Sequence, residues 1–393
     1  MVSGKQLAIF VFIDAFGWKL LQRHSFLDDT LICKARLDTI FGYSSTCDPT
    51  ILTGLMPQDH GHFSSFYFAP HESPFRACKY LKYLPASITR RGRVRRLISR
   101  SVAGAYGYTG YFQLYNMPFD RLPLFGYAER RDLYQPGGIN GGQATIVDVW
   151  RDRGIRFSLS DWRRSEVENL SRLRKDIEGG EIEAAYLYLA AMDAVLHAKG
   201  TTAAEVTDKI AWYETQLRAV LKTANEQYEE VSLTIFSDHG MTAVIKVSDL
   251  MPRIEKLGLT FGVDYAAVYD STMARFWFMN ENARLRICAA LQAEPDGKIL
   301  TEDELRAFGC DFPDHKYGDL FFVMDPGVVI CPSFMGETRL AGMHGYDPAH
   351  EDSAAIFAST HPPVVLPQRL DDLYRVMDEA TAGRKPVLTV GAP

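Results

Sequence analysis

Six carboxylate and imidazole side chains in four separate segments have the types that bind divalent metal ions. They are Asp14, Asp193, His197, Asp238, His239 and His344. Taken alone, an Asp at the end of a strand commonly caps a turn, and an Asp beside a His can be incidental. Together, the six supply the oxygen and nitrogen donors that two metal ions need. The set therefore predicts a two-metal centre.

Two of these segments have a spacing that suits a single ion. Asp193 and His197 are four residues apart, so their side chains share a face if the chain is helical there. Asp238 and His239 are adjacent and would diverge in a regular strand. Gly240 permits a turn, in which both side chains could converge on one cation.

A hydroxyl cluster, Ser44-Ser45-Thr46, precedes a predicted helix over Asp48–Leu55. Such a cluster is often only a helix N-cap. The start of a helix also stabilises an alkoxide and phosphate oxygens, and metal coordination helps a serine hydroxyl to ionise at neutral pH. The cluster is therefore a candidate source of a nucleophile.

Short buried strands that alternate with helices would position these groups. Four runs are apolar throughout, which is typical of parallel strands covered on both faces, namely Leu7–Ile13, Ala184–Ala191, Val231–Phe236 and Ala354–Ala358. Helical patterns are found at Asp48–Leu55, Thr202–Asn225, Glu281–Ala293 and Leu370–Thr381. This alternation predicts an α/β fold with helices on both faces of the sheet and the site at the carboxyl ends of the strands.

Two stretches depart from this alternation. Residues 64–142 are rich in aromatic residues, Gly, Pro and Arg, and we expect an inserted cap or substrate-recognition region there. A second irregular insertion is predicted over residues 248–317, with one strand near Met273–Met279. The catalytic domain then comprises residues 1–63 and 143–381, and residues 382–393 are predicted to form a loose tail.

The composition excludes several classes of protein. The 393 residues include 49 Asp and Glu against 43 Lys and Arg, so the formal charge of −6 argues against a general nucleic-acid coat protein. A hydrophobic content of 47% excludes a disordered or coiled-coil chain. The six cysteines form no C-x-x-C pair and favour a reduced, cytoplasmic setting. The opening apolar run is too short for a membrane span and lacks a signal cleavage site.

The segment Arg90–Arg100 contains six arginines. It is interpreted as a solvated basic face of the cap, with binding of an anionic substrate tail or peripheral contact with an anionic surface as the alternatives. Aromatic residues follow it, and they are expected to form cap core rather than a base-stacking platform. These residues are Tyr106, Tyr108, Tyr111, Phe112 and Tyr115.

In their order along the chain, the segments resemble the alkaline phosphatase superfamily, most closely its type I phosphodiesterase and nucleotide pyrophosphatase branch. The resemblance rests on Thr53-Gly54-x-x-Pro57-x-x-His60-Gly61, Asp193-x-x-x-His197, Ser237-Asp238-His239-Gly240-Met241 and His344-Gly345-Tyr346-Asp347, with Tyr317-Gly318-Asp319-Leu320 before the last. It covers residues 5–66 and 180–360 and leaves the cap unmatched. It implies an alkaline-phosphatase-like, mostly parallel central sheet flanked by helices, with an inserted cap region.

The resemblance also implies roles for individual residues. Asp14, Asp238 and His239 would hold one metal ion together with the nucleophile, and Asp193, His197 and His344 would hold the other. Counting back nine residues from Thr53 gives Ser44 as the nucleophile, where many relatives have threonine. Ser45 and Thr46 remain alternatives. Two divalent ions are expected, with zinc suited to the mixed ligands and manganese also compatible.

Two departures from the family pattern limit the substrate. Ser44 is not followed by the C/S-x-P-x-R motif of sulfatases, so hydrolysis of sulfate esters is not expected. Ser65 stands where the branch commonly has an asparagine that holds a phosphoryl oxygen. Ser65 is therefore a candidate substrate-binding residue, and backbone amides or a cap residue are alternatives for this role.

The function predicted from these observations is hydrolysis of phosphoric esters by a phosphodiesterase or nucleotide pyrophosphatase that forms a phosphoseryl intermediate. One alternative is a phosphomonoesterase or phosphotransferase acting on glycan-linked or lipid-linked phosphate. Another is a catalytically silent, metal-stabilised protein that binds an anionic partner. A phosphate-ester small molecule is the expected partner, and the sequence does not indicate an oligomeric state.

Overall fold

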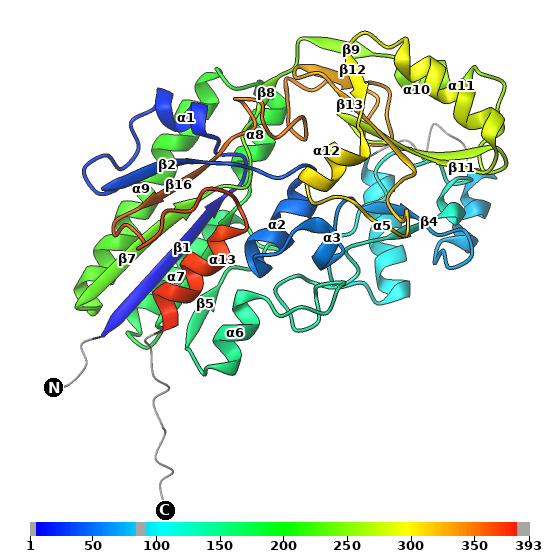
Figure 1. The fold of residues 1–393 in the computed structure, drawn as a ribbon. Helices are drawn as coiled ribbons and strands as arrows, with labels where there is room; N and C mark the ends of the chain where they lie inside the picture. The colour runs from blue at the N-terminus through cyan, green and yellow to red at the C-terminus, as the bar shows by residue number, and fades with distance from the viewer. Residues whose placement is uncertain (1–4, 84–91, 383–393) are drawn as a thin grey trace, which may run out of the picture.

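The computed structural model describes residues 5–83 and 92–382, and its largest sheet has six strands (Figure 1). In order across the sheet these are β2 (Cys33–Leu37), β16 (Ala355–Ser359), β7 (Glu230–Phe236), β1 (Gln6–Ile13), β6 (Ala184–Leu189) and β5 (Phe157–Leu159). β1 pairs in parallel with β6 and β7, and β5 pairs in parallel with β6. The prediction of an α/β fold with a mostly parallel central sheet is confirmed.

Helices cover both faces of this sheet. Odd-numbered residues of β1 pack against the layer formed by α1 (Trp18–Arg23), α7 (Glu166–Glu178), α8 (Ala191–Lys199) and α9 (Ala204–Gln227). Even-numbered residues pack against α2 (Ser44–Thr53), α6 (Ile146–Asp152) and α13 (Asp372–Ala382). Because the two faces are equally apolar environments, β1 has no polar alternation.

The direction predicted for Ala354–Ala358 is wrong. This segment forms β16, which pairs antiparallel with both β7 and β2. All five residues of β16 are buried, as expected for a strand that is covered on both faces. A continuous apolar run therefore indicates that both faces of the strand are covered. It does not indicate the direction of the strand.

The segment predicted as an irregular insertion, residues 248–317, is also more ordered than expected. It contributes to an antiparallel sheet in the order β10 (Tyr265–Tyr269), β11 (Met273–Phe278), β13 (Leu320–Met324) and β12 (Gly297–Ile299). The helices α10 (Leu250–Glu255), α11 (Glu281–Gln292) and α12 (Glu302–Ala307) accompany this sheet. The strand expected near Met273–Met279 is confirmed as β11. The sheet crosses the predicted boundary, since β13 lies beyond residue 317. Its strands are short, so the sequence shows no clear strand pattern for most of them.

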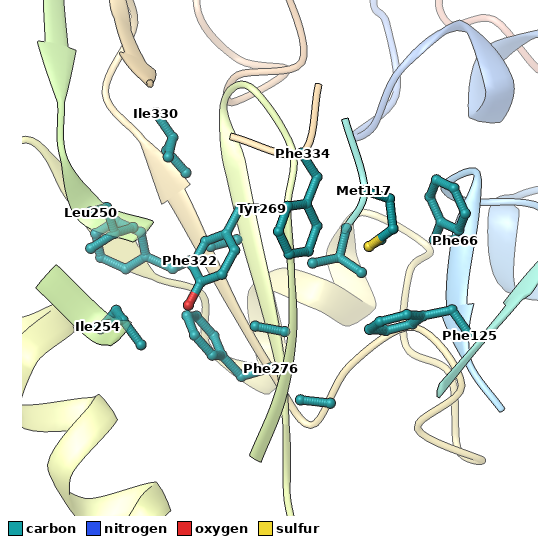
Figure 2. Packing of buried hydrophobic residues seen from close by; sticks show 14 of the residues in the cluster. Phe66, Met117, Phe125, Leu250, Ile254, Tyr269, Phe276, Phe322, Ile330 and Phe334 are labelled. Carbon is teal, nitrogen blue, oxygen red and sulfur yellow. The ribbon is translucent and has the colours of Figure 1, made fainter. Parts of the chain in front are cut away.

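Buried residues between positions 66 and 127 pack against this second sheet in one hydrophobic core, whereas Leu133, Tyr134 and Ile139 pack in the core of the six-stranded sheet. Figure 2 shows Phe66, Met117 and Phe125 from that segment close to Phe334, with Phe276 and Phe322 of the sheet. The segment contains β3 (Phe66–Phe68), η1 (Arg76–Tyr83), α5 (Gly92–Tyr106), η2 (Leu122–Leu124) and β4 (Phe125–Tyr127). Two further two-stranded sheets pair β14 (Val328–Ile330) with β9 (Lys246–Ser248) and β15 (Gly342–Met343) with β8 (Thr242–Ala243). The domain boundaries at residues 63 and 142 remain a prediction.

The arginine-rich segment is only partly a solvated face. Arg90, Arg91 and the tail from residue 383 lie outside the described residues. In α5, Arg95 is buried: its Nη1 donates to the Met117 carbonyl oxygen across 2.8 Å, and its guanidinium lies over the Phe119 ring. The other arginines of α5, Arg93, Arg96 and Arg100, are exposed.

None of the helices within residues 5–83 and 92–382 combines the length and apolar character needed to cross a membrane.

Candidate active site

Three neighbouring strands of the central sheet deliver three carboxylates to one edge. Asp14 follows β1, Asp238 follows β7, and Asp193 lies in the first turn of α8, which begins two residues after β6. Because these strands are parallel and adjacent, their carboxyl ends meet at that edge. The chain turns sharply there: Ala15 has a left-handed φ of 59°, and its backbone N–H donates to Asp238 Oδ1 across 3.1 Å.

Two glycines allow the loops that carry these ligands to approach each other. A Cβ atom added at Gly17 would lie 2.4 Å from the Cα atom of Gly240. A Cβ atom added at Gly240 would lie 2.1 Å from the carbonyl oxygen of Asp352. The loop after β1 and the loop after β7 therefore pack backbone to backbone, which fixes the position of Asp14 relative to Asp238 and His239.

Asp14, Asp238 and His239 form the first group of possible metal ligands. One ligand atom from each lies within 4.8 Å of those of the others, and all three side chains are buried. The Nδ1 atom of His239 lies 2.9 Å from the Gly240 carbonyl oxygen, so Nδ1 carries the proton and donates it. This hydrogen bond fixes the tautomer in which Nε2 is free to act as a ligand.

Asp193, His197 and His344 form the second group, within the same 4.8 Å limit. The predicted helical spacing is present, since Asp193 and His197 share α8 and their Oδ1 and Nε2 atoms are 3.1 Å apart. His197 Nδ1 donates to the Gly342 carbonyl oxygen across 2.9 Å, which again leaves Nε2 free. His344 directly follows β15, and its ring stacks on that of His239 at a centroid distance of 3.7 Å.

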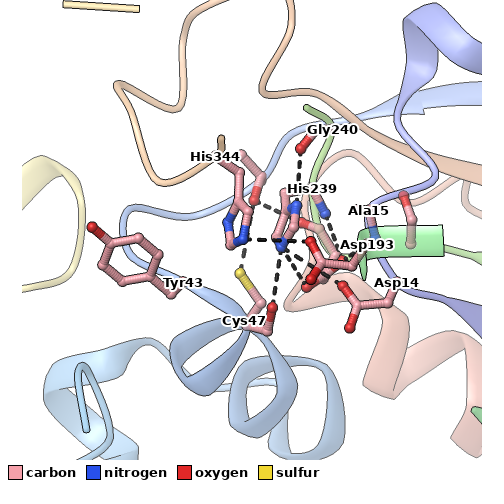
Figure 3. Close-up of polar contacts among 12 residues, drawn as sticks. Asp14, Ala15, Tyr43, Cys47, Asp193, His239, Gly240 and His344 are labelled. Carbon is pink, nitrogen blue, oxygen red and sulfur yellow. Dashed lines mark hydrogen bonds and ion pairs between the residues drawn. The ribbon is translucent and has the colours of Figure 1, made fainter. Parts of the chain in front are cut away.

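The two groups are contiguous, as Figure 3 shows for Asp14, Asp193, His239 and His344, whose side chains point toward one another. Burial, reinforced by the charges of Asp238 and Asp193, raises the pKa of Asp14 well above its usual range. Burial and the neighbouring imidazoles lower the pKa of His344. Within the described structure, Asp14 Oδ1 and His344 Nδ1 have no hydrogen-bond partner. Converging carboxylates and imidazoles with orphaned buried atoms fit divalent cations.

The helix that carries the hydroxyl cluster begins earlier than predicted. α2 starts at Ser44 instead of Asp48, because the Tyr43 N–H donates to Thr46 Oγ1 and the Thr46 N–H donates to the Tyr43 carbonyl oxygen. Pro49 lies inside the helix. Ser44 is consequently the first residue of α2, rather than part of a turn before it.

Of the three hydroxyls, Ser44 lies closest to the metal-ligand groups in the contacts that the structure gives. Its Oγ atom is 3.1 Å from His239 Nε2. Thr46 is fully buried, and its hydroxyl donates to the Phe63 carbonyl oxygen, so it serves the fold of the loop. Ser45 borders the same cavity as Ser44.

A cavity of about 510 Å³ opens beside these residues. Its wall includes the candidate residues Ser44, Ser65, Asp14, Asp193, His197 and His344. Ser65 borders the same cavity as the hydroxyl cluster, and its role in binding substrate stays a prediction. Among the described residues of the arginine-rich segment, none borders the cavity.

Sequence reasoning missed several residues of the cavity. Tyr188 lies in β6, and its hydroxyl donates to Asp14 Oδ2 across 2.5 Å. Asp48 and Glu129 also border the cavity. Of these residues, only Tyr188 had a signal in the sequence: it is a polar-tipped residue near the end of the apolar run that forms β6. Tyr111 and Tyr115, expected in the cap core, both border the cavity, although Tyr115 also packs against that core.

Comparisons with known proteins agree with this geometry. Residues 8–347 match the family model for type I phosphodiesterase / nucleotide pyrophosphatase. No curated protein matches the chain significantly. Human ectonucleotide pyrophosphatase / phosphodiesterase 5 is similar in structure, with a TM-score of 0.67 and 16% identity over 95% of this chain and 94% of that chain. The murine protein has a TM-score of 0.68 and 16% identity over 98% of both chains. Its inactive form in complex with AMP has a TM-score of 0.68 and 16% identity over 96% of this chain and 95% of that chain. The fold is thus alkaline-phosphatase-like.

Proposed function

Because the chain belongs to the type I phosphodiesterase / nucleotide pyrophosphatase family, we propose that it is a two-metal phosphodiesterase that acts through a covalent intermediate on Ser44. The observation that carries this proposal is the position of Ser44 at the start of α2, with its Oγ atom 3.1 Å from His239 Nε2. A nucleophile in this position faces both groups of possible metal ligands and the cavity.

Two divalent cations are part of the proposal. Asp14, Asp238 and His239 would hold one, and Asp193, His197 and His344 would hold the other. The mixture of carboxylate and imidazole ligands supports zinc, and manganese accepts the same ligand types. When bound, the ions would supply Lewis-acid stabilisation of the phosphate oxygens and lower the pKa of the serine hydroxyl.

The residues of the chain account for the two displacement steps. Ser44 Oγ attacks phosphorus in line with the bond to the departing alcohol, so a Ser44–phosphorus bond forms and the ester bond breaks. The serine gives up its proton to solvent, and the departing oxygen takes one up to leave as the alcohol. Water then attacks the same phosphorus, and the Ser44–phosphorus bond breaks to regenerate the hydroxyl. An alcohol in place of water would yield a transferase reaction with the same residues.

The first turn of α2 would bind a phosphoryl oxygen during both steps. Amides at the start of a helix have no partner within the helix, and the helix dipole favours negative charge there. The Ser65 hydroxyl is on the same cavity and is proposed to share this task, in place of the asparagine common in the family.

We also propose a cytoplasmic setting for the chain. Support comes from its six cysteines, all of which are free thiols in the structure. Free thiols persist in a reducing compartment.

The function is tested by comparing Ser44→Ala with Ser45→Ala. We expect Ser44→Ala to lower the turnover of bis(p-nitrophenyl) phosphate by about a thousandfold or more, because it removes the nucleophile. Ser45→Ala should retain most of the activity, since the structure gives its side chain no contact with the ligand groups. Rates are measured after the metal has been stripped and zinc or manganese restored.

A quenched reaction of the wild type should also contain protein heavier by one nitrophenylphosphoryl group. Loss of activity in Ser45→Ala but not in Ser44→Ala would show that Ser45 is the nucleophile and that Ser44 is not. Faster hydrolysis of p-nitrophenyl phosphate than of the diester would favour the phosphomonoesterase alternative. An inactive wild type with every metal would favour the silent binding protein.

A further inference from the structure

The cavity wall away from the metal-ligand groups is acidic and aromatic. Besides the ligands, its carboxylates are Asp48, Glu129, Asp132 and Asp270, and its aromatic residues are Tyr43, Tyr111, Tyr115, Tyr134, Trp162 and Tyr188. No lysine or arginine in the described part of the chain borders it. A wall of this composition repels additional negative charge on a substrate and attracts positive charge.

Two of the four carboxylates already have cationic partners. Asp132 Oδ2 lies 2.9 Å from Arg163 Nη1, and Asp270 Oδ2 lies 3.3 Å from Arg275 Nη2. Both carboxylates are almost fully buried, so these pairs neutralise charges that the fold itself requires. Asp48 and Glu129 are therefore the carboxylates left to interact with a substrate.

Asp48 lies one helical turn after Ser44 on α2, and so on the same side of the helix. Its Oδ1 atom is buried and has no hydrogen-bond partner among residues 5–83 and 92–382. Burial raises the pKa of Asp48, and the charges of Asp238 and Glu129 raise it further. Asp48 is thus an acceptor close to the nucleophile that nothing in the described chain satisfies.

Glu129 follows β4 and approaches the same space from the other core of the molecule. One carboxylate oxygen, Oε1, accepts a hydrogen bond from the Tyr111 N–H across 3.0 Å, which orients the side chain. Burial raises the pKa of Glu129 to about 8. A cation placed between Glu129 and Asp48 would relieve the repulsion between the two carboxylates.

Aromatic side chains complete this part of the wall. The Tyr111 ring packs edge to face on Trp162 at a centroid distance of 5.9 Å, and its hydroxyl donates to Gln113 Oε1 across 2.9 Å. Tyr115 has a left-handed φ of 44°, a strained conformation for a tyrosine, which the surrounding structure holds in place. Electron-rich ring faces stabilise an ammonium ion that leaves water.

We propose that Asp48, Glu129, Tyr111 and Tyr115, which we call the acidic subsite, bind a primary ammonium group on an alcohol of the phosphodiester substrate. A primary ammonium has three N–H donors for carboxylate acceptors, which a quaternary ammonium lacks. The proposal rests on the proposed function, because the subsite is part of the same cavity. It excludes pyrophosphates as the preferred substrates, since their second phosphate would add negative charge beside two carboxylates.

The probe is a pair of symmetrical diesters, bis(2-aminoethyl) phosphate and dipropyl phosphate. They differ in having an ammonium or a methyl group at each end, and their symmetry presents that group to the subsite in either orientation. Each is tested as a competitive inhibitor of bis(p-nitrophenyl) phosphate hydrolysis by the metal-loaded enzyme. We expect the aminoethyl diester to bind at least about tenfold more tightly, and Glu129→Gln or Asp48→Asn to bring the ratio of inhibition constants close to one.

Glu226→Gln is the matched control, because Glu226 is exposed on α9, outside the cavity, and the substitution removes the same charge. It should leave the ratio of inhibition constants at the wild-type value. Circular dichroism spectra check that each variant is folded, and elemental analysis checks that it retains two metal ions per chain.

Several results would overturn the acidic subsite. These are equal binding of the two diesters to the wild type, an unchanged ratio in both Glu129→Gln and Asp48→Asn, or tighter binding of the quaternary analogue bis(2-trimethylammonioethyl) phosphate. Loss of a metal ion in either variant would assign the carboxylates to a cation site instead. If the wild type hydrolyses no diester, the proposed function fails, and calorimetric titration with the same two diesters still decides the subsite.

Discussion

The Tyr188 hydroxyl orients a carboxylate of the first group of possible metal ligands. It donates to Asp14 Oδ2 across 2.5 Å, while Asp14 Oδ1 has no hydrogen-bond partner in the described structure. The hydrogen bond orients the carboxylate so that one oxygen points toward Asp238 and His239. Groups that hold a ligand in this way contribute to metal affinity without touching the ion.

We predict that Tyr188→Phe weakens binding of one of the two metal ions about tenfold, because Asp14 loses the hydrogen bond that orients it. The dissociation constants are measured by competition with a chromophoric chelator. Tyr186→Phe is the matched control, since Tyr186 lies two residues earlier on the same strand and its hydroxyl makes no hydrogen bond with Asp14. Equal affinities in Tyr188→Phe and the wild type would show that Asp14 does not need this support.

At the scale of the elements, the close packing of the loops after β1 and β7 determines whether the first group can assemble. Gly17 has a φ of −69°, which any residue can adopt, so only space restricts this position. Its Cβ would lie 2.4 Å from Gly240 Cα, and neither backbone can yield without moving Asp14 or His239. The glycine is required by the neighbouring chain rather than by its own conformation.

We predict that Gly17→Ala lowers the stability by at least about 2 kcal/mol and weakens metal binding as well, because the two loops must separate. Urea denaturation and chelator competition measure the two effects. Gly104→Ala is the control: Gly104 is in α5 with nothing within 4 Å of a Cβ, so alanine should stabilise the protein by about 0.5–1 kcal/mol. Unchanged metal affinity in Gly17→Ala would refute the coupling between the loops.

These elements also show how far the sequence could be interpreted. The apolar runs that end in Asp14, Asp238 and the Asp193 turn predicted three strands, because burial on both faces leaves a continuous signal. The direction of β16 could not be predicted, since its partners are remote in sequence. The start of α2 depends on the hydrogen bond from the Tyr43 N–H to Thr46 Oγ1, so the hydroxyl cluster expected before the helix forms its first turn.

The part of the site whose residues follow strands was predictable from the sequence. The part that depends on residues of the segment predicted as a cap was not. The two groups of possible metal ligands come together as the family pattern implied. Asp48 and Glu129 belong to segments far apart in the chain, and only the packing of the two cores puts them on one cavity. No spacing in the sequence could indicate that proximity.

At the scale of the whole molecule, Arg275 connects the cap to the second sheet. It is fully buried in β11, and its guanidinium donates to Ser64 Oγ, to the carbonyl oxygens of Phe66 and Tyr317, and to Asp270. These partners belong to three segments that are remote from one another in sequence. One side chain therefore joins the start of the segment predicted as a cap to the second sheet.

We predict that Arg275→Met destabilises the protein by about 3–5 kcal/mol, because Asp270 is left as a buried charge without its partner. The midpoint of urea unfolding measures this effect. Adding Asp270→Asn should recover part of the loss, since the remaining side chain no longer carries a charge. Arg306→Met, on the exposed surface of α12, should change the stability by no more than about 0.5 kcal/mol. Equal midpoints for Arg275→Met and the wild type would refute the connection.

The position of β1 in the sheet has a consequence for the order of events during synthesis. β1 is translated before β6 and β7, yet it lies between them in the sheet, where Ala8 pairs with Ala184 and Leu7 with Val231. Until β6 and β7 have been translated, the nascent chain presents an apolar strand whose two edges have no sheet partner. Both pairings join residues that are remote in sequence, and long-range pairings of this kind slow the folding of a domain.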